Sequence, residues 1–356
     1  MPIPSSIAIA GAGLVGSLLA WRLLEDAQQS GLKRRVELFE KSSLKYPRAA
    51  AHTAAAMISP LSEVVVSERA IYDMGICSLG LWPQWLSTLN KHSATPVAYN
   101  NQGSLVVAHP SDESELEQFA QDLHFHLQHE NTATWLTGHE LRQREPDLSQ
   151  QFNRGLLLPD EAFLDNRQLM INLHQRIVAL GGKIHENAEM QFQPQAVCDG
   201  FDLSRFALCV DARGVGAAQS QAVRGVRGEV LWVQTPEIKL QHAVRLMHPR
   251  YKLYIVPKPN NSFIVGATEI ESQDSSPVSV QSMMELCSAL YTLNPAFAEA
   301  RIIELDANLR PSYLNNMPAI HHQPQQGTAS INGLYRHGYL LAPHLIAQFI
   351  DSLKSA

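Results

Sequence analysis

The sequence predicts an α/β protein in which a Rossmann-like domain is interrupted by a domain built on an antiparallel sheet. Residues 6–40 read as strand, glycine-rich turn, helix and strand, which is the order of a βαβ unit. From Gly225 to Thr268 the chain becomes a succession of short apolar strands. From Gly333 onward it returns to a glycine-rich turn and an apolar strand, before a closing helix. We therefore expect the first domain to be assembled from separate parts of the chain.

Composition limits the class of protein. The chain has 356 residues, of which 45% are hydrophobic, and this is enough for two domains with substantial cores. Charged residues make up 17% and the formal net charge is −6, so no basic stripe is expected for a nucleic acid. No run is long and apolar enough to predict a membrane span. A small molecule is the expected partner, and assembly into a homo-oligomer stays open.

The cysteines and the first residues indicate a cytoplasmic protein. Cys77, Cys198, Cys209 and Cys287 are widely spaced and form no CxxC pair, as expected of thiols in a reducing compartment. The apolar stretch 7–21 follows no lysine or arginine and is interrupted by glycines, which does not fit an export signal.

Three clustered histidines do not predict a metal site. His124, His126 and His129 lie in a stretch that is expected to be helical, and their spacing spreads them around the helix. A zinc-binding pair on a helix requires the i and i+4 positions. We therefore expect no metal.

Apolar periodicity and capping residues predict four helices between the first βαβ unit and the sheet region. The two later helices are opened by the capping sequences Thr137-Gly-His-Glu140 and Asp165-Asn-Arg-Gln168. The helices are expected from about Val66 to Asn90, from near Ser111, from Thr137 to before Pro146, and from Asp165 to Gly181, with a strand following at Lys183.

The strands after Gly225 are expected to form a twisted antiparallel sheet. GEVLWVQT is followed by YKLYIVP, a Pro-Asn-Asn turn and SFIVGAT, and the last two strands form a hairpin. In the second strand, Lys252, Tyr254 and Val256 share one face.

Two further expectations concern charges and the end of the chain. Arg245, Arg250 and Lys258 are interpreted as strand-edge charges that favour solubility. Pro343 is expected in the first turn of a closing amphipathic helix.

The glycine-rich turn predicts a dinucleotide site. Gly11, Gly13 and Gly16 form a GxGxxG motif between a strand and a helix, where they permit a tight turn and the close approach of a pyrophosphate. The helix N-terminus then offers N–H groups to the phosphates. Glu40 ends the second strand, in the place where a carboxylate binds ribose hydroxyls, and it argues against a 2′-phosphate. The motif alone does not separate NAD from FAD.

A further set of segments decides between the cofactors by resemblance. Together with the glycine-rich turn they span some 330 positions in a fixed order, and they include TAAAM, SPLSE, SLGLWPQWL, DARG, RGE, YIVP, VGAT, LRP, GLYRHG and LLAP. In this set the chain resembles the D-amino-acid oxidase superfamily, and within it the glycine oxidase branch associated with thiamine biosynthesis. The resemblance implies an FAD-dependent enzyme with a Rossmann-like FAD-binding domain and an inserted antiparallel-sheet substrate domain.

The resemblance also implies where the cofactor lies and how the domains divide. Ala55, Ala56 and Met57 are expected against the flavin, and Gly214, Gly333 and Gly338 are expected to bring backbone close to the cofactor. The FAD-binding domain is expected to comprise residues 1–83, 150–224 and 305–356, and the substrate-binding domain residues 84–149 and 225–304. We expect non-covalent FAD, because no cysteine follows Cys287 to form the covalent link found in some sarcosine oxidases.

Three residues are candidates for the catalytic site. Arg310 is the expected grip on a substrate carboxylate, because a guanidinium binds a carboxylate through two parallel hydrogen bonds and keeps its charge when buried. The resemblance gives Tyr254 the role of a second carboxylate donor and Arg336 a supporting role near substrate or flavin. The residues alone leave other interpretations open: a surface ion pair for Arg310, cross-strand packing for Tyr254, and a carbonyl cap for Arg336.

The expected reaction is oxidative deamination of a small amino acid, with glycine, sarcosine or a D-amino acid as candidate substrates and oxygen as the expected acceptor. Two alternatives stay open: a dehydrogenase with another electron acceptor, and a flavoprotein partner without turnover. The sequence departs from the usual glycine oxidase pattern, which places the identity of the substrate in question. The departures are Lys252, Asn315-Asn316, His321 and Leu334.

Overall fold

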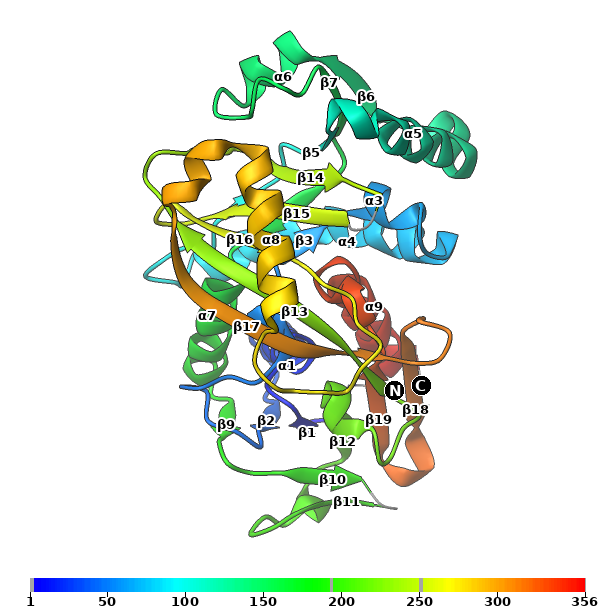
Figure 1. Ribbon diagram of the computed structural model, residues 1–356. Coiled ribbons are helices and arrows are strands. Elements are labelled where there is room, and N and C mark those ends of the chain that lie inside the picture. The colour runs from blue at the N-terminus through cyan, green and yellow to red at the C-terminus, as the bar shows by residue number, and fades with distance from the viewer. Residues whose placement is uncertain (1–2, 193–194, 250–251, 356) are drawn as a thin grey trace.

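The computed structural model describes residues 3–192, 195–249 and 252–355 of the chain. Within these residues the fold contains two large β-sheets, which lie one above the other in Figure 1. The marked N- and C-termini lie near one another beside the smaller sheet (Figure 1). Mixed α/β architecture is therefore confirmed, with helices packed against both sheets.

The six-stranded sheet contains the predicted βαβ unit. Its parallel strands are largely buried, because helices and neighbouring segments cover both faces of the sheet. Burial on both faces explains why the sequences of these strands are continuous apolar runs. The hairpin partner β18 is the antiparallel exception at the edge. In spatial order the strands are β18 (Ala319–Gln323), β19 (Thr328–Asn332), β12 (Leu208–Asp211), β1 (Ser6–Ala10), β2 (Arg35–Phe39) and β9 (Lys183–His185).

Four long helices form the core with this sheet. They are α1 (Leu14–Gln29), α4 (Arg69–Asn90), α7 (Asn166–Ala179) and α9 (Gly338–Ser355). The core that they share includes the fully buried Trp21, Trp82 and Phe349. The indole of Trp82 also donates a hydrogen bond of 2.8 Å to the carbonyl of Tyr339, which joins α4 to the start of α9. No strand forms between the glycine-rich turn and Pro343, a stretch that the structure describes in full, because a 3₁₀ turn leads directly into α9 at Gly338. Pro343 therefore lies in the second turn of α9 and not in its first.

The predicted helix starts agree with the structure to within a few residues. Asp165 caps α7 by accepting hydrogen bonds from the backbone N–H groups of Arg167 and Gln168. Thr137 and Glu140 form the predicted reciprocal capping box at the start of α6 (Gly138–Arg144). The acidic helix α5 (Glu113–Leu127) begins just after the expected Ser111, because the 3₁₀ turn η1 (Pro110–Asp112) precedes it.

The eight-stranded sheet contains the strands predicted after Gly225. The three predicted strands, β13, β15 and β16, pair antiparallel as expected, and the last two form the predicted hairpin. The sheet as a whole is mixed, because β14 pairs in parallel with β5, which comes from an earlier part of the chain. In spatial order the strands are β17 (Arg301–Ser312), β13 (Arg224–Gln234), β16 (Ser262–Gly266), β15 (Lys252–Lys258), β14 (Ala243–Met247), β5 (Ser104–Ala108), β7 (Arg154–Leu158) and β6 (Thr134–Thr137). Helix α8 (Val280–Leu293) packs across it, as Figure 1 shows.

Alternation along β15 divides its side chains between two environments. Leu253 and Ile255 enter the core beneath α8. Val256 and the partly buried Tyr254 belong to the opposite face, together with Val230 of β13. The shared face predicted for Tyr254 and Val256 is thus confirmed, and the structure describes the backbone of Lys252 but not its side chain.

Shorter elements complete the described chain. The two small sheets comprise β10 (Met190–Phe192) with β11 (Ala196–Cys198), and β3 (Met57–Ile58), β8 (Ala162–Leu164) and β4 (Tyr99–Asn100). The short helices are α2 (Ala50–Thr53) and α3 (Pro60–Val64), and the remaining 3₁₀ turns are η2 (Gln128–Glu130), η3 (Leu203–Arg205), η4 (Gly214–Ala217), η5 (Pro295–Glu299), η6 (Pro324–Gln326) and η7 (Tyr335–His337).

The segments assigned to the FAD-binding domain supply every strand of the six-stranded sheet. Two of these segments also extend into the eight-stranded sheet, as strands β7 and β17. The domain limits themselves stay a prediction.

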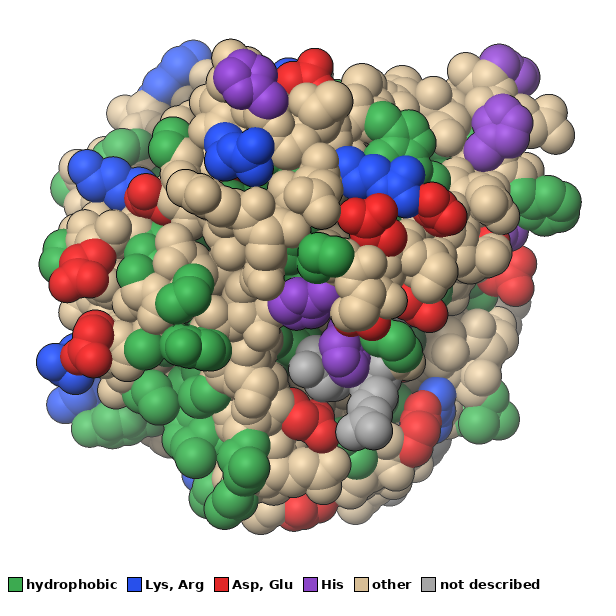
Figure 2. Space-filling model, turned by 45° about the horizontal axis from the view of Figure 1, so that its top comes forward, with side chains coloured by type: hydrophobic (Ala, Val, Ile, Leu, Met, Phe, Trp, Pro, Cys, Tyr) green, Lys and Arg blue, Asp and Glu red, His purple; other side chains and the backbone are tan. Residues whose placement is uncertain are grey.

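The described surface mixes charge signs. On the face in Figure 2, acidic and basic side chains are interspersed, and apolar side chains gather in one region at the lower left. No helix within the described ranges is both long and apolar enough to cross a membrane.

Candidate active site

A cavity of about 1280 Å³ extends between the glycine turn after β1 and the strands of the larger sheet. Both sheets contribute to its lining: Gly11 and Glu40 follow strands of the six-stranded sheet, and Tyr254 and Arg310 belong to strands of the eight-stranded sheet. This volume exceeds the roughly 300–1,000 Å³ of pockets for drug-sized ligands. The cavity therefore has room for a dinucleotide-sized molecule and a small substrate.

The glycine turn leaves no space for side chains. Gly11 has φ +95°, and a Cβ there would lie 2.6 Å from the carbonyl oxygen of Ala212. A Cβ on Gly16 would lie 1.9 Å from the carbonyl oxygen of Gly11, so Gly16 lets α1 pack on the turn but does not itself line the cavity. Gly13 lines the cavity at the start of α1, where no side chain caps the first N–H groups. Those groups are available to an anion.

Glu40 is fixed in the position expected of a ribose-binding carboxylate. Its Oε2 accepts a hydrogen bond of 2.9 Å from the N–H of Ala12 in the glycine turn. Its Oε1 accepts hydrogen bonds of 3.0 and 2.7 Å from the N–H and hydroxyl of Ser42. The carboxylate also lines the cavity, so an edge of it can serve a ligand.

The other predicted cofactor residues divide into two groups. Those that line the cavity are Ala55, Ala56, Met57, Gly214 and Gly338. Gly333 is not among the lining residues, and its missing side chain leaves room for the ring of Tyr313, which a Cβ would approach to 2.2 Å.

Two charges interpreted as strand-edge residues are placed differently by the structure. Lys258 is 8% exposed, and its ammonium group donates hydrogen bonds of 2.7 and 2.6 Å to the carbonyls of Ala55 and Leu164. Arg245 lines the cavity. Alternation in β14 and β15 turns both side chains inward, so the solubility interpretation is wrong for them, and Arg250 lies outside the described residues.

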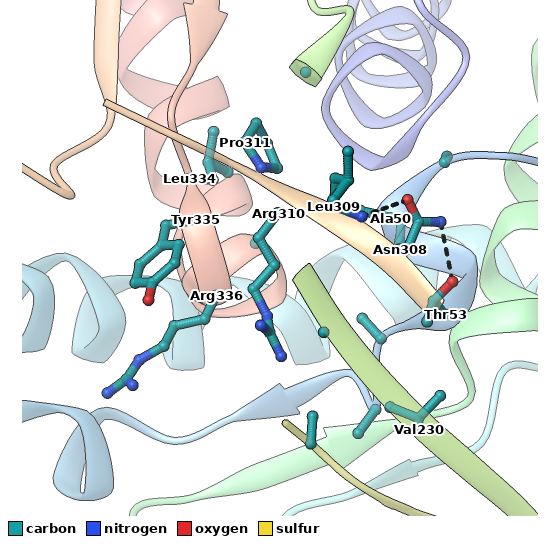
Figure 3. A pocket seen from close by; sticks show the side chains of 18 of the residues that line it. Ala50, Thr53, Val230, Asn308, Leu309, Arg310, Pro311, Leu334, Tyr335 and Arg336 are labelled. Atoms are coloured by element: carbon teal, nitrogen blue, oxygen red, sulfur yellow. Dashed lines mark hydrogen bonds between the residues drawn. The ribbon is translucent and has the colours of Figure 1, made fainter. Parts of the chain in front are cut away.

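Arg310 extends from β17 into the catalytic end of the cavity (Figure 3). Its two terminal nitrogens donate hydrogen bonds of 3.2 and 2.9 Å to the carbonyls of Arg227 and Thr268. Its guanidinium lies against Gly228, where a Cβ would approach the nearest nitrogen to 2.3 Å. No carboxylate pairs with Arg310 within the described part of the chain. The carbonyls orient the guanidinium without neutralising it, and Glu269, which it influences electrostatically, forms no ion pair with it.

Tyr254 lines the same end of the cavity from β15. Burial raises the pKa of its hydroxyl, although the nearby Arg310 and Arg245 oppose this shift. The phenol therefore keeps its proton near neutral pH and can donate a hydrogen bond.

Arg336 is held by acidic side chains. Figure 3 shows it beside Arg310 and Tyr335, extending from η7. Its guanidinium contacts Glu63 through Nε and Nη2, at 2.9 and 2.8 Å, and Glu269 through Nη1, at 3.0 Å. Tyr335 donates a hydrogen bond of 2.7 Å to the other oxygen of Glu269.

These contacts determine the charges around Arg336. Burial opposes ionisation of Glu63, but Arg336 and His337 hold its pKa below the ordinary value. Burial also lowers the pKa of His337 to about 4, so its imidazole is neutral at pH 7. Arg336 is thus a charged residue whose partners are already in place.

Sequence reasoning missed three residues that line this cavity, and it also missed the burial of Lys258 behind Ala55. Glu63 stood in a motif that resembles the family but received no role, and Glu269 followed another such motif. Arg245 and Lys258 were assigned to the surface. For Arg245 and Lys258 the sequence did contain a signal. Each alternates with apolar residues on a strand that is otherwise buried on both faces, and this pattern indicates an inward-facing charge.

The geometry defines a class of protein: an enzyme with an elongated cofactor site that begins at a dinucleotide turn and ends at an arginine-lined pocket. The residues fit FAD, because the turn excludes side chains where a pyrophosphate would approach and Glu40 lies at the ribose position. The family model described as FAD dependent oxidoreductase (DAO) matches residues 6–350. The chain belongs to this D-amino-acid oxidase family, and the family implies a flavin cofactor.

Within the family, the chain is similar to glycine oxidases and to ThiO proteins. It is 35% identical over 344 residues to a Rhizobium etli protein named as a thiamine biosynthesis oxidoreductase, ThiO, with 96% of this chain and 94% of the relative covered. Its fold matches the crystal structure of glycine oxidase from Geobacillus kaustophilus, with a TM-score of 0.81, 24% identity and coverage of 98% and 94%. It also matches iminodiacetate oxidase from Chelativorans sp. BNC1, with a TM-score of 0.80, 21% identity and coverage of 97% and 95%.

Lys258 should make stability depend on pH. Burial lowers its pKa from 10.5 to about 7 in the folded chain. Between pH 7 and pH 10.5 the unfolded chain binds more protons than the folded chain, so the free energy of unfolding should rise as the pH rises through this range. On acidification towards pH 7 this gain in stability should be lost. Urea unfolding at pH 7, 8 and 9 should show a shallower rise in Lys258→Met than in wild type.

The comparison uses the slope of the free energy of unfolding against pH and not its absolute value. The absolute value also changes because Lys258→Met removes two hydrogen bonds. Lys183→Met, at a lysine whose side chain is 67% exposed, should keep the wild-type slope. An unchanged slope in Lys258→Met would show that Lys258 titrates normally.

Proposed function

We propose that this enzyme oxidises a small amino acid at its C–N bond, with non-covalently bound FAD. The observation that carries the proposal is Arg310, a guanidinium with no carboxylate partner among the described residues, in a cavity that the glycine turn also lines. The similarity to ThiO and glycine oxidase supports it, and we propose a role of the thiamine-biosynthesis type.

Arg310 and Tyr254 would orient the substrate. A guanidinium held by two carbonyls has little freedom left to lose when it binds a carboxylate through its remaining N–H groups. The protonated phenol of Tyr254 would donate a further hydrogen bond to the same carboxylate. When bound, the flavin supplies the hydride acceptor for the α-carbon. Fixing the carboxylate contributes to rate by restricting how the α-carbon approaches the flavin.

The described residues support deprotonation of the amine by the environment. A buried, partly apolar site lowers the pKa of an ammonium group, so the reactive neutral amine forms without a strong base. Arg336 would have a supporting role beside the substrate, because Glu63 and Glu269 already hold its guanidinium and offset its charge. The imine product would hydrolyse to an oxo-acid with ammonia or an amine, and oxygen would reoxidise the flavin to give hydrogen peroxide.

Non-covalent binding is supported by the lining of the cavity, which contains no cysteine among the described residues. The residues that would hold FAD are Gly11, Gly13, Glu40, Gly214 and Gly338, together with the segment Ala55–Met57. Cys77, Cys198, Cys209 and Cys287 are free thiols, which supports a cytoplasmic location.

The test is reduction of the bound flavin. The purified holoenzyme is mixed anaerobically with glycine, sarcosine and D-alanine in turn, and the visible flavin absorbance is followed. Bleaching by one of them, followed by oxygen consumption and peroxide release on aeration, is expected. Bleaching that oxygen does not reverse would indicate a dehydrogenase, and a flavin that no amine bleaches would contradict the proposal.

Gly228→Ala should impair substrate binding without abolishing the fold. The new Cβ would meet the guanidinium of Arg310 at 2.3 Å, and a flexible side chain can move away from such a contact. Displacement breaks the alignment with the two carbonyls, so KM for the amino acid should rise roughly tenfold or more, as expected for a weakened hydrogen bond to a charged group. Steady-state oxygen consumption measures it.

Gly225→Ala is the matched control on the same strand, because the atoms nearest to its Cβ belong to the apolar side chain of Leu309 and not to Arg310. Equal KM values in the two variants would contradict the specific role of Gly228.

A further inference from the structure

Arg245 is a second guanidinium in the cavity that the proposed chemistry does not use. It stands on β14 directly opposite Tyr254 of β15, and both side chains line the catalytic end. Its Nε is buried and has no hydrogen-bond partner. Within the part of the chain that the structure describes, no ion pair or hydrogen bond joins Arg245 to another side chain. A buried cationic donor without a partner is costly, and it marks a place where a ligand can supply one.

The nearby carboxylates are committed to other groups. Glu161 is fully buried, and its two oxygens accept hydrogen bonds from the N–H of Ser62, at 2.7 Å, and from the hydroxyl of Ser104. Glu63 directs one oxygen at the guanidinium of Arg336. Burial raises the pKa of Glu161, which weakens it further as a counter-charge for Arg245. These acids lower the potential around Arg245 but leave its N–H groups free for another acceptor.

Arg245 and Arg310 face the same space from opposite sides of Tyr254. Gly266 is the cross-strand neighbour of Tyr254 on β16, and Arg310 reaches the carbonyl of Thr268 just beyond Gly266. Both guanidiniums act on the Tyr254 hydroxyl, where they oppose the rise in its pKa. Two anionic groups, one on each side of Tyr254, could therefore each bind a separate guanidinium, that of Arg245 or that of Arg310.

We infer that Arg245 is a second anion-binding residue of the substrate site, so that the preferred amino acid carries a second carboxylate besides the one held by Arg310. The inference rests on the proposed amino-acid oxidation and narrows its substrate class. The second carboxylate can belong to a substituent on the nitrogen or to the α-side chain. In both cases the shared chemistry is a dicarboxylate amino acid whose two acids are held by two separate guanidiniums.

Binding of inert acids tests the inference without turnover. Calorimetric titration of the holoenzyme with acetate, malonate, succinate and glutarate compares one carboxylate with two at increasing separation. At least one dicarboxylate should bind roughly ten- to a hundredfold more tightly than acetate, as expected for an added charge-assisted interaction. Arg245→Met should remove this advantage and leave the acetate affinity within about twofold of wild type.

Two further variants make the result interpretable. Arg224→Met removes an arginine of the same sheet that pairs with Glu271 and does not line the cavity, and it should keep the dicarboxylate preference. Arg245→Lys retains the charge beside Glu161 and Glu63 but loses the planar fork, so it should keep only part of the preference. It also remains informative if the methionine variant does not fold.

Anaerobic flavin reduction identifies the source of the second acid. Faster bleaching by iminodiacetate than by sarcosine indicates a substituent on nitrogen, and faster bleaching by D-aspartate than by D-alanine indicates the side chain. A wild-type enzyme without dicarboxylate preference, or a preference that survives in Arg245→Met, overturns the inference. If the acids bind as expected but no amine bleaches the flavin, the proposed oxidation fails and the anion site stands.

Discussion

Replacing Arg310 by methionine should lower kcat/KM for the amino-acid substrate by roughly two to three orders of magnitude. Truncating one partner of a buried, hydrogen-bonded charge pair costs about 2–5 kcal/mol. Arg310 carries this expectation because its guanidinium faces the cavity without a carboxylate and is oriented by the carbonyls of Arg227 and Thr268. Anaerobic bleaching rates as a function of substrate concentration measure the loss.

Arg310→Lys separates charge from geometry. Lysine keeps the positive charge but cannot form two parallel hydrogen bonds, so it should recover only part of the lost activity. Both variants should retain flavin, since the glycine turn and Glu40 that would hold the cofactor are unchanged. If Arg310→Met retains wild-type substrate affinity, the carboxylate is held elsewhere.

Gly16→Ala should abolish flavin binding. The added Cβ would lie 1.9 Å from the carbonyl oxygen of Gly11, and neither the helix backbone nor the turn can move without displacing α1 from β1. The N–H groups at the start of α1 would then no longer face the cavity in the geometry that binds a pyrophosphate. We expect purification without the visible flavin spectrum and a lower Tm, measured by absorbance and calorimetry.

Gly80→Ala is the matched control, because Gly80 also lies inside a helix but a Cβ there meets no atom within 4 Å. This change should stabilise the protein by about 0.4–1 kcal/mol through lower entropy of the unfolded chain, with flavin content unchanged. Full flavin occupancy in Gly16→Ala would contradict the packing argument.

Three of the arginines that line the cavity differ in how their guanidinium groups are held. Arg336 is held by Glu63 and Glu269, Arg310 is oriented by backbone carbonyls, and Arg245 has no hydrogen-bonded partner within the described residues. A guanidinium paired with carboxylates has little charge to offer a substrate, whereas one held by neutral carbonyls keeps its full charge. This difference supports Arg310 and Arg245, and not Arg336, as anion-binding groups.

Local signals were sufficient for the parts of the fold that depend on neighbouring residues. The βαβ unit follows from the alternation of apolar runs with GxGxxG, and the caps at Asp165 and Thr137 follow from side chains that reach the next turn. These features involve contacts between residues close in sequence, so the sequence displays them directly. The family resemblance added FAD and the expected positions of Arg310 and Tyr254.

The pairing of strands that are far apart in the sequence could not be predicted from local patterns. The parallel pairing of β14 with β5 joins segments some 140 positions apart, and no local pattern specifies which strand becomes a neighbour. The same limit applies to Gly333, whose missing side chain accommodates Tyr313 and not the cavity.

The sequence by itself determined the dinucleotide turn, the order of the main elements and the residue types able to hold a carboxylate. Only the tertiary structure decided which charges face the cavity. Arg245 and Lys258 read as edge charges because a charged residue in a strand is usually solvated. The neighbouring strands and the segment around Ala55 enclose them instead, and burial is set by packing between distant segments, which no local pattern records.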